Sequence, residues 1–209
     1  MDRVRIGVLV SGGGTNLQAL MDACGEDKIM GEVVLVISNR EDAFALKRAL
    51  DNGIASKFVS PLEFEGHDYD RELLRLFIEA EVQLVVLAGY LRVLSPLFIE
   101  AYRDRIINIH PSLIPKFCGK GFYGERVHRA VLESGEKETG ATVHIVDEGT
   151  DTGPILLQEI VPVMNDDTVQ TLQKRVLKVE HKILVEAVGK ICLGIGNENY
   201  GGNHEASID

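Results

Sequence analysis

The distribution of apolar residues along the chain predicts a parallel β-sheet. Runs rich in valine and isoleucine recur at Ile6–Val10, Val33–Ile37, Leu84–Leu87 and Ile106–Ile109. Each run is almost continuously apolar, which is typical of strands that are covered on both faces. We therefore expect these segments to form the interior of a sheet that has helices on both sides.

Helical periodicity fills the intervals between these runs. Leu17, Leu20, Met21 and Cys24 follow the i, i+3, i+4, i+7 spacing of an amphipathic helix, and the segment Asp68–Glu81 shows the same spacing. Because strands and helices alternate, the pattern predicts an α/β fold of the doubly wound, Rossmann-like type.

The chain changes character in its last third. Ala141–Asp147 and Ile155–Val163 are predicted strands joined by the turn Gly149–Pro154, a connection that favours antiparallel pairing. A long helix over about Asp167 to Leu193 follows. The predicted fold is thus a mostly parallel open sheet with an antiparallel C-terminal edge and a long C-terminal helix.

The predicted elements also give the domain organisation. We expect residues 1–194 to form a single domain, because 209 residues suit one α/β unit and no linker divides them. Residues 195–209 contain several glycines and no periodicity, so we expect a loose C-terminal tail.

Charge and cysteine content narrow the class of protein. A formal net charge of −10 does not favour nucleic-acid binding, because that requires clustered lysine and arginine. Cys24, Cys118 and Cys192 are too scattered for a disulfide framework or a zinc site, so we expect reduced thiols. We find no signal sequence and no membrane-spanning segment, and therefore expect a cytoplasmic protein. The pattern gives no prediction of the oligomeric state.

A glycine-rich segment, Ser11–Asn16, follows the first predicted strand and leads into the first helix. Free backbone N–H groups at the start of a helix can bind a phosphate. Leu17 occupies the third glycine position of the dinucleotide-binding pattern, and the segment lacks the lysine of a P-loop. A tight strand-to-helix turn explains the segment equally well, so its meaning depends on the motifs below.

The segment Asn108-Ile109-His110-Pro111-Ser112 lies at the end of a predicted buried strand. The two-residue period of a strand places Asn108 and His110 on the same face, at the carboxyl edge where open α/β sheets bind ligands. An amide donor beside an imidazole can stabilise an oxyanion and transfer a proton, as acyl transfer requires. Alternatively, both side chains only hydrogen-bond the turn imposed by Pro111 and Pro115.

An acidic loop, Asp147–Pro154, supplies a candidate partner for the histidine. A carboxylate near His110 would stabilise the charged imidazole and raise its pKa. The alternative is a hairpin turn with solvated acids, which fits Asp147 and Glu148 better than Asp151. His144 is interpreted as a hydrogen-bonded histidine of the sheet. The histidines are too widely spaced for a metal-binding motif, so no metal is predicted.

Four sequence blocks, in this order, resemble the folate-dependent phosphoribosylglycinamide formyltransferases of purine biosynthesis. The resemblance extends from about Val4 to Leu193. The four blocks are Ser11–Ala19, Ala88–Pro96, Asn108–Pro115 and Val143–Pro154. The resemblance implies an enzyme that transfers the formyl group of 10-formyltetrahydrofolate to the amine of phosphoribosylglycinamide.

The resemblance also implies residue roles. Asn108 and His110 would hold the oxyanion, with His110 as the proton donor and Asp151 keeping the imidazole charged. The substrate phosphate would bind Gly14, Thr15 and Asn16, and the nucleotide would contact Glu180, which could instead be an exposed helix carboxylate. The pterin ring of the folate would lie against Asn108 and the backbone of Leu91, Arg92, Val93 and Leu94.

Two segments differ from the compact form of this family. The loop Cys118–His128 is longer and richer in glycine, and the segment Glu63–His67 lacks an arginine that some relatives offer to the acidic tail of the folate. Three alternatives use the same residues: a 10-formyltetrahydrofolate hydrolase, a methionyl-tRNA formyltransferase and a nucleotide-binding module without catalysis. The chain's length and its acidic charge argue against the second of these.

Overall fold

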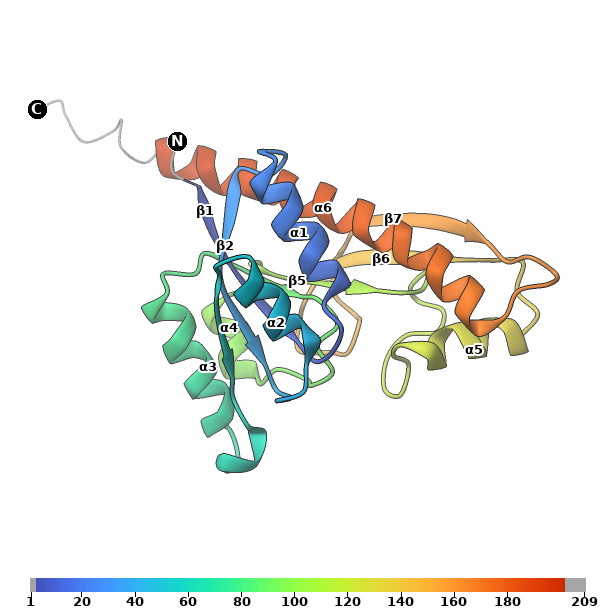
Figure 1. The fold of residues 1–209 in the computed structure, drawn as a ribbon, viewed down its shortest axis with the longest axis horizontal. Helices are drawn as coiled ribbons and strands as arrows, with labels where there is room; N and C mark the ends of the chain where they lie inside the picture. Colours follow the sequence, from blue (N-terminus) through green and yellow to red (C-terminus); the bar gives the residue numbers. More distant parts are fainter. Residues whose placement is uncertain (1–2, 202–209) are drawn as a thin grey trace, which may run out of the picture.

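The computed structural model describes residues 3–201 and contains a seven-stranded sheet in the order β3-β2-β1-β4-β5-β6-β7 (Figure 1). The strands are β1 (Val4–Val10), β2 (Gly31–Ser38), β3 (Ala55–Phe58), β4 (Leu84–Leu87), β5 (Ile106–His110), β6 (Glu138–Ile145) and β7 (Ile155–Pro162). Strands β1 to β5 pair in parallel, whereas β6 is antiparallel to both β5 and β7. The predicted mostly parallel sheet with an antiparallel C-terminal edge is confirmed.

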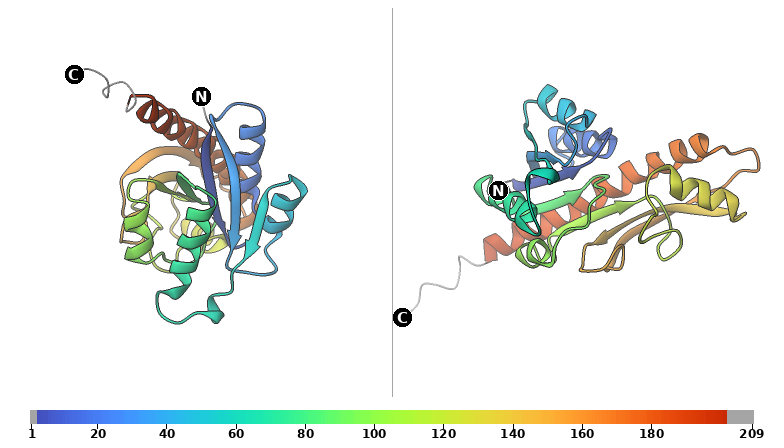
Figure 2. Two further views of the ribbon diagram at one scale, coloured as in Figure 1. Left: turned by 90° about the vertical axis from the view of Figure 1, so that its left-hand side faces the viewer. Right: turned by 90° about the horizontal axis from the view of Figure 1, so that it is seen from below.

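Helices cover both faces of the sheet, as the two further views in Figure 2 show. The helices are α1 (Thr15–Gly25), α2 (Phe44–Asp51), α3 (Asp68–Glu79), α4 (Pro96–Ala101), α5 (Glu125–Glu133) and α6 (Val169–Gly201), with a short 3₁₀ helix at Pro61–Glu63. Helices α1 and α6 share one apolar core with the sheet, and α3 and α4 share the other. Within residues 3–201, no helix is long and apolar enough to span a membrane.

The apolar run of β1 shows why the strands are buried on both faces. Ile6, Val8 and Val10 belong to the core under α1 and α6, whereas Leu9 points into the core under α3 and α4. All four side chains are fully buried. A strand that fills two cores needs apolar residues at successive positions, so its sequence is continuous rather than alternating.

The prediction missed strand β3 and placed the end of the last helix too early. Strand β3 has four residues and lies at the edge of the sheet, where alternate side chains are exposed and no apolar run marks it. Helix α6 continues past Leu193 to Gly201, so the predicted loose tail is wrong for residues 195–201. A glycine costs a helix about 1 kcal/mol, but an existing helix gains a backbone hydrogen bond with each added residue. The predicted tail residues 202–209 lie outside the described residues.

Candidate active site

The structure places Asn108 and His110 at the carboxyl end of β5, as the two-residue strand period predicts. His110 is 5% exposed and Asn108 is half-buried. Strand β6 pairs antiparallel with this end of β5, and the loop that connects β6 to β7 returns beside it. The site therefore lies where the sheet changes from parallel to antiparallel pairing.

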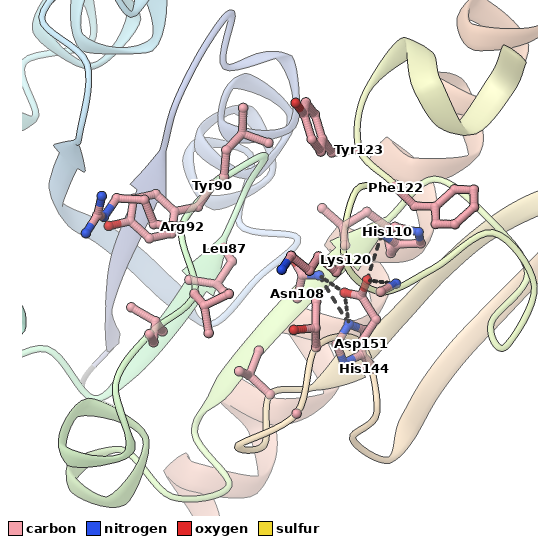
Figure 3. Close-up of a pocket in the computed structure, with 18 of the residues that line it drawn as sticks. Leu87, Tyr90, Arg92, Asn108, His110, Lys120, Phe122, Tyr123, His144 and Asp151 are labelled. Carbon is pink, nitrogen blue, oxygen red and sulfur yellow. Dashed lines mark hydrogen bonds and ion pairs between the residues drawn. The ribbon is translucent and has the colours of Figure 1, made fainter. Parts of the chain in front are cut away.

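Asp151 reaches the site from the loop between β6 and β7. One carboxylate oxygen, Oδ2, lies 3.6 Å from Nδ1 of His110, and the other, Oδ1, lies 3.4 Å from the Asn108 amide nitrogen. The residue has a left-handed φ of 59°, a conformation that residues other than glycine seldom adopt. The structure thus brings together the three residues that the sequence singled out (Figure 3).

His144 is a fourth member of this cluster, although its place in the sequence predicts only a hydrogen-bonded histidine of the sheet. Its Nε2 lies 3.1 Å from the Asn108 amide nitrogen and 3.5 Å from Oδ1 of Asp151. Its Nδ1 donates to the carbonyl of Ile145 at 2.8 Å, because a carbonyl oxygen can only accept. Nε2 of His144 therefore faces the Asn108 amide and helps to fix the orientation of that amide.

The pairing register of β5 and β6 explains why His144 lies at the site. Asn108 and His144 are directly opposite in the antiparallel pair of β5 and β6. Side chains at opposite positions share one face and lie in contact. An alignment of the two predicted strands would have brought His144 to the site, but the register depends on the long connection between them, which has no sequence rule.

The loop after Pro115 also contacts the site. The carbonyl of Phe117 accepts a hydrogen bond from Nε2 of His110 at 2.9 Å, and the backbone N–H of Gly119 donates to Oδ2 of Asp151 at 2.9 Å. Both contacts use main-chain atoms, so residue types do not reveal them. The loop therefore orients the imidazole and the carboxylate together.

Burial determines the charge state of His110 in this structure. It lowers the pKa of the imidazole below 6.5, and the neighbouring Asp151 carboxylate and Phe117 carbonyl oppose this effect only in part. The contribution of the Asp151 carboxylate to the pKa of His110 has the direction that the prediction requires, because it opposes the effect of burial. His110 is neutral near pH 7.

Asp151 keeps its negative charge despite its position. Burial raises the pKa of Asp151, but the nearby His144 and His110 and the Gly119 N–H outweigh it and lower the pKa below 3.8. The site at neutral pH thus combines an ionised carboxylate with a neutral imidazole. Such a pair can take up one proton at the imidazole and stabilise the resulting charge.

A cavity of about 400 Å³ opens beside these side chains. The predicted pterin-binding residues Leu91, Arg92, Val93 and Leu94 all line it, together with Asn108 and His110. Residues 119–124 of the loop after Pro115 form another wall. A mostly apolar cavity with a few polar groups at one end is typical of a small-molecule site.

The glycine-rich segment lies between β1 and α1, outside the lining of this cavity. Gly14 is the N-cap residue of α1 with a left-handed φ of 70°, so Thr15 and Asn16 begin the helix. A Cβ atom on Gly14 would come within 2.6 Å of the Ala45 side chain, so both conformation and space require glycine. The segment offers free N–H groups at a helix start, as predicted.

Asn16 connects this segment to the last helix. Its amide nitrogen donates to Oε2 of Glu180 at 2.8 Å, and Glu180 is 7% exposed. Glu180 is therefore not the exposed helix carboxylate of the alternative interpretation. Burial raises the pKa of Glu180 above 4.5, and Asn16 lowers it only in part. The two predicted substrate-binding groups are thus brought together across 164 positions of sequence.

Ser11 joins the glycine-rich segment to the wall of the cavity. Its hydroxyl accepts from the backbone N–H of Leu91 at 2.9 Å and donates to Oδ1 of Asn39 at 2.6 Å. Its own N–H donates to the carbonyl of Gly89. From its place in the sequence, Ser11 is predicted only to be part of the glycine-rich segment. In the structure it holds the backbone of the predicted pterin-binding residues against the end of β1.

The part of the chain that the structure describes contains no group of three or more His, Cys, Asp or Glu side chains arranged to hold a metal ion. His110, His128 and His144 form no such group.

The fold and the site define an α/β protein whose amide, imidazole and carboxylate suit acyl transfer at the edge of a sheet. A family model described as formyl transferase matches residues 4–188. The chain belongs to the formyl transferase family.

Individual relatives agree with this assignment. The chain is 44% identical to the phosphoribosylglycinamide formyltransferase of Escherichia coli (strain K12), over 86% of this chain and 83% of that protein. It is 43% identical to the chloroplastic phosphoribosylglycinamide formyltransferase of Arabidopsis thaliana, covering 91% of this chain but 66% of that protein. The crystal structure of glycinamide ribonucleotide transformylase 1 from Symbiobacterium toebii matches with a TM-score of 0.87 and 44% identity, over 92% and 89% of the two chains.

Proposed function

We propose that the chain transfers the formyl group of 10-formyltetrahydrofolate to the amine of phosphoribosylglycinamide, a step of purine biosynthesis. The observation that carries this proposal is the convergence of Asn108, His110 and Asp151 beside a cavity of about 400 Å³. The names of the relatives at 43% and 44% identity support the choice of substrates.

The reaction joins the amine of the glycinamide to the formyl carbon. The amine nitrogen forms a bond to that carbon, the carbonyl oxygen becomes an oxyanion, and the bond to N10 of the folate then breaks. The Asn108 amide and the His110 N–H are the donors for the oxyanion, because both lie at the end of β5 and line the cavity. No covalent intermediate with the protein is needed.

The reaction also moves a proton from the attacking amine to N10 of the folate. The amine loses one proton and N10 gains one, so the reaction consumes no net acid. His110 takes part next to the ionised Asp151, which stabilises the imidazole when it holds the extra proton. In the structure the His110 Nε2 proton is donated to the Phe117 carbonyl. A substrate oxygen would take the place of that carbonyl, and such hydrogen bonds often form only in the bound complex.

The glycine-rich segment and Glu180 form the second half of the proposed site. The N–H groups at the start of α1, at Gly14, Thr15 and Asn16, would bind the phosphate. Glu180, oriented by Asn16, would accept hydrogen bonds from hydroxyl groups of the nucleotide. Leu91, Arg92, Val93 and Leu94 would hold the pterin ring in the cavity through backbone atoms and apolar contact.

The test is an assay with both substrates. Incubation of the purified chain with phosphoribosylglycinamide and 10-formyltetrahydrofolate should yield formylated glycinamide and tetrahydrofolate in equal amounts. Formate release without any transfer would indicate a hydrolase instead. The His110→Ala variant should still bind the nucleotide but lose turnover. A wild-type chain that binds the nucleotide and shows no turnover would be a binding module. The proposal is refuted if the wild-type chain releases formate without transfer, or if it binds the nucleotide without turnover.

We also propose that the chain works in the cytoplasm on small molecules, without nucleic acid or membrane partners. The described cysteines Cys24, Cys118 and Cys192 are free thiols, which supports a reducing compartment. The net charge of −10 supports the absence of a nucleic-acid partner. Cell fractionation followed by immunodetection would test the location.

A further inference from the structure

The glycine-rich segment offers donors for a phosphate but carries no positive charge of its own. Residues 11–16 contain no lysine or arginine. In the part of the chain that the structure describes, the backbone N–H groups of Gly14, Thr15 and Asn16 have no acceptor. A phosphate monoester carries a charge of about −1.5 to −2 at pH 7. A positive group that compensates this charge must therefore come from another element.

Helix α2 lies beside the start of α1 and binds the carbonyl groups of the segment (Figure 1). The Ala45 N–H donates to the Gly12 carbonyl at 3.0 Å. Nε of Arg48 donates to the Gly13 carbonyl at 2.8 Å. The C=O and N–H of a trans peptide point in opposite directions. The Gly14 N–H, which belongs to the same peptide as the Gly13 carbonyl, therefore points away from α2, where a phosphate can reach it.

The Arg48 side chain is held against the segment, but part of its guanidinium is free. Nη1 donates to Oε1 of Gln18 at 3.2 Å, and the guanidinium carbon lies 5.0 Å from the centre of the Phe44 ring. A Cβ on Gly14 would lie 3.4 Å from Cδ of Arg48, so the aliphatic part of the side chain packs there. Among residues 3–196, whose side chains are described, Arg48 takes part in no salt bridge and its Nη2 has no partner. The half-buried guanidinium thus keeps an uncompensated positive charge beside the segment.

We propose that Arg48 is a positioning residue for the substrate phosphate, which fixes the Gly13–Gly14 peptide with its N–H toward the phosphate and compensates part of the phosphate charge. This inference rests on the proposed function, in which the substrate is phosphoribosylglycinamide. A hydrogen bond to the carbonyl of a peptide polarises its N–H, and so strengthens the bond from that N–H to an anion. Arg48 thus provides, from a neighbouring helix, the positive charge that a lysine provides in a P-loop.

The test separates binding of the phosphate from binding of the rest of the nucleotide. Arg48→Met removes the charge and the donors but keeps most of the aliphatic part that packs against Gly14. It should raise the KM for phosphoribosylglycinamide about fivefold to twentyfold and weaken competitive inhibition by inorganic phosphate by a similar factor. The kcat, the KM for the folate and inhibition by ribosylglycinamide, which lacks the phosphate, should stay within about twofold of wild type.

Two variants on the same helix are controls. Lys47→Met also removes one positive charge, but the Lys47 ammonium binds Asp51 rather than the segment, so its KM should stay within about twofold of wild type. Arg48→Lys keeps a positive charge near Gly13 and should return the KM to within about threefold of wild type. If Arg48→Met does not fold, Arg48→Gln provides the same test, because it also removes the charge.

Three results would overturn the inference. Arg48→Met could leave the KM for phosphoribosylglycinamide and the inhibition by inorganic phosphate unchanged, it could weaken ribosylglycinamide as much as phosphate, or Lys47→Met could produce the same loss. A wild-type chain that forms no formylated product would instead refute the proposed function. Calorimetric binding of inorganic phosphate to the wild type and to Arg48→Met would still test the role of Arg48, so the two failures are distinguishable.

Discussion

Replacement of Asp151 by asparagine removes one negative charge and little volume. The asparagine Oδ1 can still accept the Gly119 N–H, which donates to Asp151 at 2.9 Å. Its new NH₂ group then faces the amide nitrogen of Asn108, which lies 3.4 Å from the present carboxylate oxygen. Two donors meet where a donor and an acceptor met before. We expect the fold to persist and the catalytic cluster to lose its stabilising charge.

The size of the effect follows from the separation of the two groups. A carboxylate 3.6 Å from Nδ1 of His110 interacts with a protonated imidazole by about 4 to 5 kcal/mol at an effective dielectric constant of about 20. This is an upper limit, because 11% of the Asp151 side chain is exposed and the amide dipole replaces part of the interaction. We therefore expect Asp151→Asn to lower kcat by roughly 100-fold to 1000-fold, comparable to the loss of an oxyanion donor.

The pH profile gives a second measurement. Asp151 opposes the effect of burial on His110, so its removal lowers the pKa of His110 further. If turnover depends on the protonated imidazole, the decrease in kcat with rising pH should move to lower pH in the variant. Steady-state kinetics over pH 5 to 9 would measure both effects. Glu148→Gln, which removes the same charge from an exposed position of the same loop, is the control.

The reasoning is refuted if Asp151→Asn raises only KM and leaves kcat and its pH profile unchanged. That result would make the carboxylate a binding group. A Glu148→Gln variant that loses as much activity would likewise show that the net charge of the loop, rather than contact with His110, is responsible.

Other expectations concern the rest of the site. Gly14→Ala should lower the free energy of unfolding by about 2 to 4 kcal/mol in denaturant titrations, because φ is 70° and the new Cβ would lie 2.6 Å from the Ala45 side chain. Gly13→Ala is the control and should be nearly neutral, because its Cβ would meet nothing within 4 Å. Ser11→Ala removes the acceptor for a cavity-lining backbone N–H and should raise the folate KM about threefold to tenfold in steady-state assays. Burial raises the pKa of Glu180, so the folded state binds its proton more tightly and loses stability as the pH rises above 4.5. Glu180→Gln should thus raise the melting temperature by a few degrees at pH 7 and less at pH 4, while activity falls; an equal shift at both pH values would contradict this.

Local sequence was sufficient to predict the interior of the fold. The continuous apolar runs that became β1, β2, β4 and β5 have to be buried on both faces, so their pattern determined the parallel sheet and its covering helices. The two-residue period placed Asn108 and His110 at the rim. The edge strand β3 lacks such a run, and its side chains are half exposed, so only pairing with β2 made it a strand.

The partners within the site depended on tertiary structure. Glu180 became a buried carboxylate only because α6 packs beside α1, which brings it to Asn16. His144 entered the site through the register of β5 and β6, and the Phe117 and Gly119 contacts use backbone atoms that carry no residue preference. The lowered pKa of His110 likewise depends on the whole fold, because burial of the imidazole outweighs the opposing effect of the Asp151 carboxylate. Short-range periodicity is determined by neighbouring residues, whereas charge state and contact depend on distances between segments far apart in the chain, which only the folded structure sets.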